Sequence, residues 1–499
     1  MPRRPFHLPR YSVLASLPLL AMCLAIGVPA PAATAKPVPP NAKLPTKPQD
    51  PAFLPPLPDT PATPVAPAGT PRPGQSKPGA PEPTRLQQSP FARAVIANFS
   101  RWDTDADGLL SAEEVEQQVL NPENTGPVAA AVAALHGRFW RAEGEARKPL
   151  SRAFFSELAK PKAPPDRASK PAGITVLPAS TPSATAPATT QAATSPGRAP
   201  GTDDDQDSEK DLEMRYSRAV QQIRTAPRSL YNGGTPDLPD CRQGAIGSCF
   251  VIAPVGAFVH RNPADVTKLI DALGGEKLGW YRIQFASGDA VEIPPFTEAE
   301  LGLAGASTRG GLWVRVLEKA FGTRKLKPED REDQVARDEI GKGGSGASTI
   351  RILTGNQTVN IRLLGDWTKP LTPKDETPQA KAEADKAKAD LDKALSQLRN
   401  QLPEALAAKR LIVTGTPATN VPTSISPRHA YAVFAFDAQA DTITLWNPHS
   451  SNFTPKGPEG LANGYARKDG LLTLPLTDYA RIFRGINIET DKPLTAPVK

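Results

Sequence analysis

The sequence predicts an α+β protein in which helices come first and an antiparallel sheet follows. The first observation is the helical spacing of Trp313, Leu317 and Phe321 in LWVRVLEKAF, which gives one broad apolar face. The second is a leucine stripe that follows Ala-, Lys- and acid-rich turns, made of Leu391, Leu395, Leu398 and Leu402. The third is a run of segments with the composition of strands: RLIVTGT, HAYAVFAF and TITLWN.

Composition limits how much of the chain can fold. The length of 499 residues allows two or three domains, but 57 prolines and long Ala/Pro/Thr tracts reduce the part that can form a core. The formal net charge of +7 comes without a dense Lys/Arg block interleaved with aromatic residues, which argues against a nucleic-acid partner. We expect disordered linkers and folded units in this order: linker 36–88, small helical unit 89–160, linker 161–212, large unit 213–490 and tail 491–499.

The N-terminus has the pattern of an export signal. A basic segment, MPRRPFHLPRY, precedes the apolar SVLASLPLLAMCLAIGV, and AATA ends at Ala35 with small residues suited to cleavage. We therefore expect a signal peptide at 1–35 and a secreted or periplasmic mature chain without a membrane span. The pair Arg3 and Arg4 leaves both general and twin-arginine export open. Removal of the signal takes away Cys23 and leaves Cys241 and Cys249.

A calcium loop is predicted in the small unit. DTDADGLLSAEE, residues 103–114, matches the twelve-residue EF-hand loop, and Gly108 permits its sharp turn. Hard oxygen ligands at this spacing suit Ca²⁺, and the expected ligands are Asp103, Asp105, Asp107, the Leu109 carbonyl, Ser111 and Glu114. EF-hands usually pair, and residues 128–159 are expected to form a degenerate partner hand that packs without chelating.

Cys249 lies in DCRQGAIGSCFVIAPVGAF, where it begins an apolar run. Ser248 is placed to cap a helix, which would put Cys249 in its first turn, where backbone N–H groups and the helix dipole favour the thiolate. Gln243 is a candidate to join the Cys249 N–H in an oxyanion hole. Two interpretations of Cys241 remain open in an exported protein: a disulfide with Cys249 or a free buried thiol.

His429 has the best context for a general base, because it opens the predicted strand HAYAVFAF. The next predicted strand, TITLWN, ends at Asn447. If this hairpin is symmetric about Ala438, His429 and Asn447 lie opposite each other and Asn447 can orient the imidazole. The result would be a Cys-His-Asn triad, although His429 taken alone is also compatible with an ordinary histidine at a strand edge.

These segments resemble the calpain family of papain-like cysteine proteases. QGAIGSC resembles the nucleophile motif, LWVRVLEKAFG the helix after it, HAYAV the histidine motif and WNP the asparagine motif, in the family's order, over residues 217–490. The resemblance implies a two-lobed papain-like core and a calcium-dependent endopeptidase acting on proteins or peptides. It implies these roles: Cys249 as nucleophile, His429 as general base, Asn447 as orienting partner and Gln243 in the oxyanion hole.

The chain departs from the calpain pattern at the site itself. Ser248 and Phe250 stand where calpains have Asp and Trp, and His449 stands where they have Trp. Pro254 falls inside the expected catalytic helix, and the calcium loop precedes the core. The departures motivate an alternative, a catalytically impaired calpain-like module that acts as a calcium-dependent protein-binding scaffold. A Cys-His-Asn transferase is a third option, without a recognisable acceptor site.

Overall fold

The computed structural model describes residues 89–141, 148–160, 204–331, 333–496 and 498. The expected signal peptide 1–35, the linker 36–88 and most of the linker 161–212 lie outside the described residues. Helix α5 (Asp204–Thr225) begins within that last segment, so the expectation of a linker is wrong for residues 204–212. An apolar stripe along α5 explains the helix, because its members are buried in a core: Leu212, Tyr216, Ala219 and Ile223.

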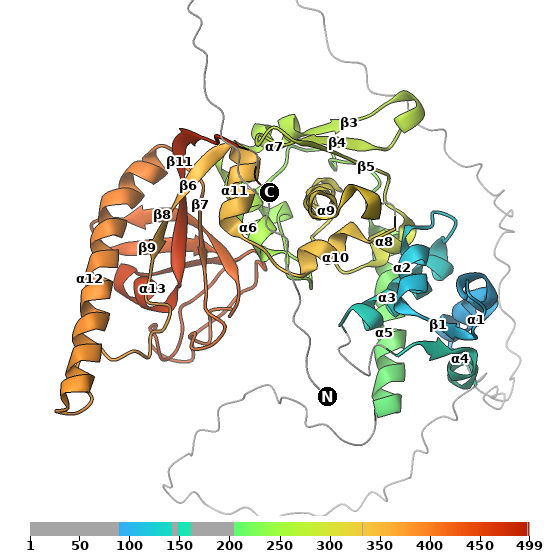
Figure 1. Ribbon diagram of the computed structural model, residues 1–499, viewed down its shortest axis with the longest axis horizontal. Coiled ribbons are helices and arrows are strands. Elements are labelled where there is room, and N and C mark those ends of the chain that lie inside the picture. The colour runs from blue at the N-terminus through green and yellow to red at the C-terminus, as the bar shows by residue number, and fades with distance from the viewer. Residues whose placement is uncertain (1–88, 142–147, 161–203, 332, 497, 499) are drawn as a thin grey trace, which may run out of the picture. The chain divides into compact units, whose positions relative to one another are not determined.

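The N-terminal part consists of two helix–strand–helix segments (Figure 1). Strands β1 and β2 pair in antiparallel fashion, with Leu109 opposite Ser151 and Leu110 opposite Leu150. This short sheet joins the loop regions of the two segments. Their elements are α1 (Pro90–Trp102), β1 (Leu109–Leu110), α2 (Ala112–Leu120), α3 (Gly126–Arg141), β2 (Leu150–Ser151) and α4 (Arg152–Leu158).

This N-terminal unit packs on helix α8 (Glu298–Gly302) of the larger unit. The hydroxyl of Thr297, which caps α8, donates to the Val119 carbonyl at 2.6 Å. Glu298 accepts a hydrogen bond from the Gly126 N–H at 2.6 Å. The apolar core of the N-terminal unit also includes residues of the larger unit: Ala299, Leu303 and Val335. The two units that we expected to be separate therefore share one core.

The first half of the larger unit surrounds helix α9 (Trp313–Lys325), which has the predicted apolar face. A three-stranded antiparallel sheet packs on α9 (Figure 1). The sheet consists of β3 (Ile270–Ala272), β4 (Tyr281–Gln284) and β5 (Ala290–Ile293). The neighbouring helices are α6 (Cys249–Arg261), α7 (Pro263–Leu269), α10 (Ala336–Gly341) and α11 (Gly346–Thr354), with 3₁₀ turns at Leu238–Asp240, Gly275–Lys277 and Pro328–Asp330.

The second half is a six-stranded antiparallel sheet in the order β10-β9-β8-β7-β11-β6. Helices α12 and α13 cover one face, and α6 and α11 pack on the other (Figure 1). The elements are β6 (Asn356–Arg362), α12 (Pro378–Ala407), β7 (Ile412–Gly415), β8 (Ala430–Asp437), β9 (Thr442–Trp446), β10 (Leu471–Pro475), α13 (Leu476–Ile482) and β11 (Gly485–Pro493). The predicted leucine stripe of α12 is buried against this sheet.

The α+β class with antiparallel sheets is confirmed. The expected order, helices first and then a sheet, is too simple, because β3–β5 lie among the first helices and β6 precedes α12. Strands β3–β5 have only three or four residues each, which is too short for a clear period-two pattern. Strand β11 continues to Pro493, past the expected domain end at 490. Within the described ranges, no helix has the length and apolar character needed to cross a membrane.

Candidate active site

Cys249 is the first residue of helix α6, as the sequence predicts, and Ser248 occupies the N-cap position. Its side chain makes no capping hydrogen bond, because the hydroxyl donates to Glu318. The helix continues through Pro254 to Arg261. Gly256 lets α6 lie directly on strand β9, since a Cβ there would come within 2.3 Å of the Trp446 ring. This close packing fixes the helix, and with it Cys249, against the sheet that carries the other candidate residues.

The Cys249 thiol lies at the beginning of strand β8. Burial raises the pKa of the Cys249 thiol above its ordinary value, while hydrogen bonds from the backbone N–H groups of Ala430, Phe250 and Cys249 itself act to lower it. The contact with Ala430 brings the sulfur next to His429, the residue before it. The backbone N–H groups at the helix start do favour the thiolate, as the sequence led us to expect, but burial outweighs them and the pKa of the thiol is raised overall.

His429 and Asn447 are joined by a hydrogen bond of 2.9 Å between His429 Nε2 and Asn447 Oδ1. Both are buried, and Asn447 is 0% exposed. A carboxamide oxygen can only accept, so Nε2 carries the proton and Nδ1 keeps its lone pair. The Asn447 side chain is itself held, because its Nδ2 donates to the Tyr431 hydroxyl at 3.3 Å and its Oδ1 also accepts from the His449 N–H at 2.9 Å.

The hairpin β8–β9 differs in register from the one that we expected. Ala432 lies opposite Trp446, so continuing the pairing puts Tyr431, not His429, opposite Asn447. A symmetric hairpin about Ala438 is therefore wrong, because Asp437 pairs with Thr442 and the turn is centred between Gln439 and Ala440. An irregularity between Val433 and Ala435 changes the register by one residue. The two side chains still meet, because residues two apart lie on the same face of a strand and diagonal neighbours are within reach.

The ring of His449 stacks on the ring of His429, with centroids 4.6 Å apart and an interplanar angle of 6°. An aromatic ring thus covers His429 at the position where the calpain pattern has tryptophan. Burial lowers the pKa of His429 to about 4, and the charges of His449 and Arg467 add to this effect, which the hydrogen bond to Asn447 opposes. His429 is therefore neutral at neutral pH, the form required of a general base.

Gln243 lies in the loop before α6 and is 8% exposed. Its Nε2 donates to the Ile246 carbonyl at 2.6 Å, and its backbone N–H donates to the Pro448 carbonyl at 2.8 Å. The second bond ties the loop before Cys249 to the residue after Asn447. One N–H of the Gln243 side-chain amide is thus used within the loop, and the second N–H takes no part in this hydrogen bond.

The remaining thiol and histidines of the described residues are engaged elsewhere. Cys241 and Cys249 are both free, and Cys241 is fully buried with its sulfur 3.8 Å from the Asp237 carbonyl. His136 contacts Asp338 at 2.8 Å, and His260 stacks on Phe434. His429 directly precedes Ala430, whose N–H contacts the Cys249 sulfur, and His449 stacks on His429.

A buried charged network, which the sequence did not predict, supports the loop before Cys249. Glu318 of α9 accepts hydrogen bonds from the Ser248 hydroxyl and the Ala306 N–H, each at 2.7 Å. Arg315 donates to the carbonyls of Ala306 and Leu301 at 3.0 Å. Burial raises the pKa of Glu318. The signal in the sequence was three charged residues within the apolar stretch of this helix: Arg315, Glu318 and Lys319.

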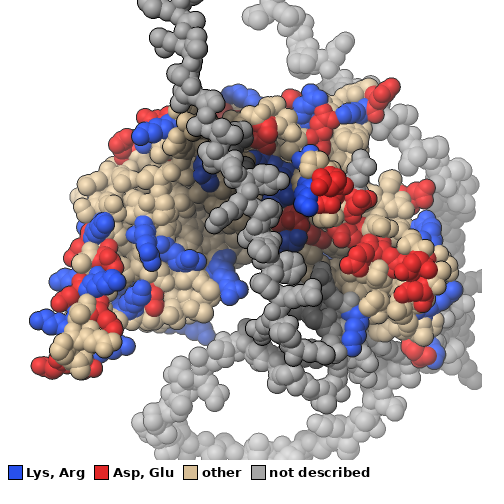
Figure 2. All heavy atoms as spheres, in the orientation of Figure 1, with Lys and Arg blue, Asp and Glu red and all other residues tan. Residues whose placement is uncertain are grey.

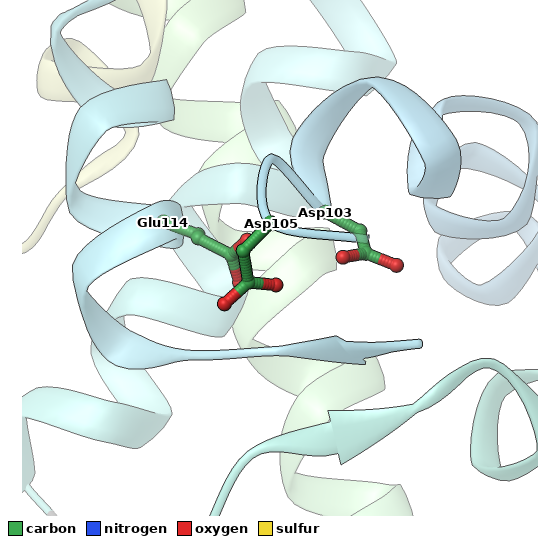
Figure 3. Close-up of side chains that lie close together, drawn as sticks. All are labelled: Asp103, Asp105 and Glu114. Atoms are coloured by element: carbon green, nitrogen blue, oxygen red, sulfur yellow. The ribbon is translucent and has the colours of Figure 1, made fainter. Parts of the chain in front are cut away.

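Three of the expected calcium ligands converge in the loop between α1 and α2. Carboxylate oxygens of Asp103, Asp105 and Glu114 lie within 4.8 Å of one another (Figure 3). The Asp103 Oδ1 atom is buried and has no hydrogen-bond partner in the described structure, as expected of an oxygen that awaits a cation. Gly108 has a φ of 82°, so the sharp turn is present. Hard oxygens around an unpartnered carboxylate oxygen fit Ca²⁺.

The other expected ligands are engaged differently. Asp107 accepts from the Leu109 N–H at 2.8 Å and lies outside the group of three. Ser111 is the N-cap of α2, where it forms a capping box with Glu114. Burial raises the pKa of Glu114, but hydrogen bonds from Ser111 and Thr104 outweigh it and hold that pKa below its usual value. Acidic side chains gather over this unit in Figure 2.

An open cleft of about 650 Å³ adjoins the candidate triad. Gly344, which lines it, lies so close to the Phe250 ring that a Cβ there would come within 2.3 Å. Gly415, on the opposite side, borders the His429 carbonyl, and Thr416 donates its N–H to that carbonyl at 2.9 Å. The cleft therefore borders Phe250, the residue after Cys249, and the backbone carbonyl of His429.

Comparison of the chain with models of known protein families and with curated proteins finds no match.

Proposed function

We propose that the protein is a calpain-like cysteine endopeptidase with a papain-like core, in which Cys249 is the nucleophile, His429 the general base and Asn447 its orienting partner. The observation that carries the proposal is the 2.9 Å hydrogen bond from His429 Nε2 to Asn447 Oδ1, beside a thiol at a helix N-terminus. Asn447 selects the tautomer whose Nδ1 accepts a proton. That nitrogen is the one needed to deprotonate Cys249.

The reaction follows from these roles. His429 Nδ1 takes the thiol proton as the Cys249 sulfur attacks the carbonyl carbon of the scissile peptide bond. The imidazolium then gives its proton to the departing amine nitrogen, which leaves a thioester on Cys249. In the second half, Nδ1 deprotonates a water that attacks the thioester, and the proton returns to the sulfur as the acid product leaves.

The tetrahedral intermediates require donors for their oxyanion. The backbone N–H of Cys249, at the start of α6, is one candidate, and the second N–H of the Gln243 amide is the other. Removal of one such donor typically costs about a hundred-fold or more in kcat. The hydrogen bond between Gln243 and Pro448 supports this role, because it keeps the loop before Cys249 beside the loop after Asn447.

Calcium and export belong to the proposal. Asp103, Asp105 and Glu114 would hold Ca²⁺, with Asp107, the Leu109 carbonyl and Ser111 completing the ligand set after local rearrangement. The bound ion would neutralise carboxylates and stabilise the loop between α1 and α2. Export of the mature chain follows from the N-terminal pattern, and protein or peptide segments that enter the cleft would be the substrates.

The test is covalent labelling of the mature full-length chain with an epoxide inhibitor, located by peptide mass spectrometry, with and without Ca²⁺. We expect one label, on Cys249, and loss of cleavage of an unfolded protein substrate in Cys249→Ala. Cys241→Ala is the matched control, since it removes the other thiol and should retain both label and cleavage. Unchanged cleavage by Cys249→Ala would overturn the proposal.

The scaffold function remains a second candidate because of one electrostatic observation. The pKa of Cys249 is raised and that of His429 lowered, so the resting pair is neutral, whereas an efficient thiol protease benefits from a thiolate. If Cys249 resists the epoxide over neutral to alkaline pH while the chain binds unfolded protein in the presence of Ca²⁺, the scaffold function is the better description.

A further inference from the structure

The cleft that borders Phe250 and the His429 carbonyl has two charged residues in its lining, Arg362 and Arg484, and no Asp or Glu. We propose that this pair selects substrates that carry an acidic residue close to the scissile bond. The inference rests on the proposed peptidase function and adds to it the chemical class of substrate. It concerns binding in the cleft, so it can be measured independently of cleavage.

The two arginines are neighbours at one end of adjacent strands. Arg362 is the last residue of β6 and lies opposite Gly485, the first residue of β11, while Arg484 directly precedes β11. The Leu363 N–H donates to the Arg484 carbonyl at 3.0 Å, which continues the pairing by one step. Both positions are therefore fixed by the sheet, and not by a loose loop.

Both guanidinium groups are available to a ligand. Each arginine is exposed, and among the described residues neither guanidinium has an ion-pair or hydrogen-bond partner. The Arg484 stem rests on Gly365, where a Cβ would come within 3.0 Å of the Arg484 Cγ. An unengaged guanidinium presents a planar fork of donors that matches a carboxylate in a bidentate manner.

The surroundings of the triad have the same sign of charge. The charges that act on the rings of His429 and His449 include Arg467 and Arg242, and neither ring has a carboxylate among the groups that shift it. Arg467 donates to the backbone carbonyls of Ser424 and Ser451 and has no carboxylate partner in the described structure. A basic peptide would thus meet repulsion, and an acidic one attraction, along the approach to Cys249.

A second hollow, of about 750 Å³, continues from Arg362 toward helix α12. Its charged lining is mixed and consists of Arg362, Lys369, Glu383, Lys386, Asp390 and Lys393. The carboxylates there partly offset the lysines, so this hollow offers less discrimination than the first. We therefore assign recognition of the acidic residue to Arg362 and Arg484, nearer the triad.

The experiment measures peptide binding to the mature full-length Cys249→Ala protein by fluorescence anisotropy. The probe is a labelled peptide with glutamates on both sides of a central Leu–Ser bond, compared with the same peptide carrying glutamine. We expect the glutamate peptide to bind about ten-fold more tightly at low salt, an advantage that shrinks as salt rises. The double variant Arg362→Gln/Arg484→Gln should bind both peptides alike, whereas Arg331→Gln, an exposed arginine outside the cleft, should keep the difference.

The outcomes separate the two proposals. Equal or undetectable binding of the two peptides, or a glutamate preference that survives in the double variant, overturns the role of Arg362 and Arg484. Tight, arginine-dependent binding of the glutamate peptide upholds that role. If the protein with Cys249 intact then cleaves neither peptide, the peptidase function fails while the acidic specificity of the cleft stands.

Discussion

The imidazole of His449 lies parallel to that of His429 at 4.6 Å, so the ring that shields the candidate base also carries a titratable charge. The two rings are coupled electrostatically, since protonation of His449 opposes protonation of His429. Burial lowers the pKa of His449, and Arg467 and Arg242 lower it further. A stacking partner without a charge would shield the site equally well, but it would alter the pH range over which His429 is neutral.

Substitution His449→Trp should raise the pKa of His429, because it removes a neighbouring positive charge and keeps an aromatic cover. The acid limb of the pH–rate profile for epoxide labelling of Cys249 should move to higher pH by up to about one unit. His260→Phe is the matched control, since His260 stacks on Phe434 and should leave the limb in place. A limb that stays unchanged in His449→Trp would contradict this coupling.

His429 should make the fold less stable toward acid. Its pKa is about 4 in the folded protein and 6.5 ordinarily, so the unfolded chain binds more protons between these values. The free energy of unfolding therefore has its full value above pH 6.5. It decreases by up to about 3 kcal/mol as the pH falls toward 4, because the unfolded chain takes up the proton first. Urea unfolding of the wild-type protein and of His429→Phe over this range isolates the effect. A difference in unfolding free energy that is constant with pH would rule it out.

The contact between Ser248 and Glu318 should position Cys249. The Ser248 hydroxyl is buried and donates to Glu318 Oε1 at 2.7 Å, so Ser248→Ala leaves a buried carboxylate with one donor fewer. We expect a loss of about 1–3 kcal/mol in unfolding free energy. We also expect slower labelling of Cys249, because the N-cap of α6 loses its anchor on α9. Ser156→Ala, at an exposed serine of α4, should change neither, and unaltered labelling in Ser248→Ala would refute the positioning role.

Local signals account for what the sequence predicted at the site. Cys249 follows a small residue at the N-cap position, and His429 and Asn447 sit at the ends of two strands that a short turn connects. Such features need only nearby residues, so they can be read from a single chain. The predicted β-hairpin register was wrong because the turn is centred between Gln439 and Ala440, where Asp437 pairs with Thr442, and not on Ala438. The irregularity between Val433 and Ala435 changes the pairing by one further step, and neither feature leaves a pattern in the sequence.

Features that depend on distant segments could not be predicted. Glu318 lies far along the chain from Ser248, and nothing in either segment specifies that the hydroxyl and the carboxylate meet. Arg362 and Arg484 become neighbours only because β6 pairs with β11 across the intervening part of the sheet. Packing on α8 likewise joins residues of the two predicted units through a core that spacing alone does not define.

Replacement of Glu114, the last of the expected calcium ligands in the loop, should weaken Ca²⁺ binding without disrupting the fold. In the described structure, Glu114 uses both oxygens to accept hydrogen bonds from Ser111 and Thr104, and an amide in Glu114→Gln can keep some of them. Isothermal titration of the mature full-length protein should show Ca²⁺ uptake by the wild type and at least a ten-fold weaker affinity for Glu114→Gln, since charge and bidentate ligation are lost.

Glu113→Gln is the matched control, because Glu113 is exposed and is not one of the expected ligands. It should bind Ca²⁺ as the wild type does. The Val119 carbonyl, in the last turn of α2, accepts a hydrogen bond from Thr297, so the ion should also protect backbone amides of α8 from hydrogen exchange. Equal uptake by Glu114→Gln and the wild type would exclude this loop as the calcium site. Uptake without protection of α8 would confine the effect of the ion to the N-terminal unit.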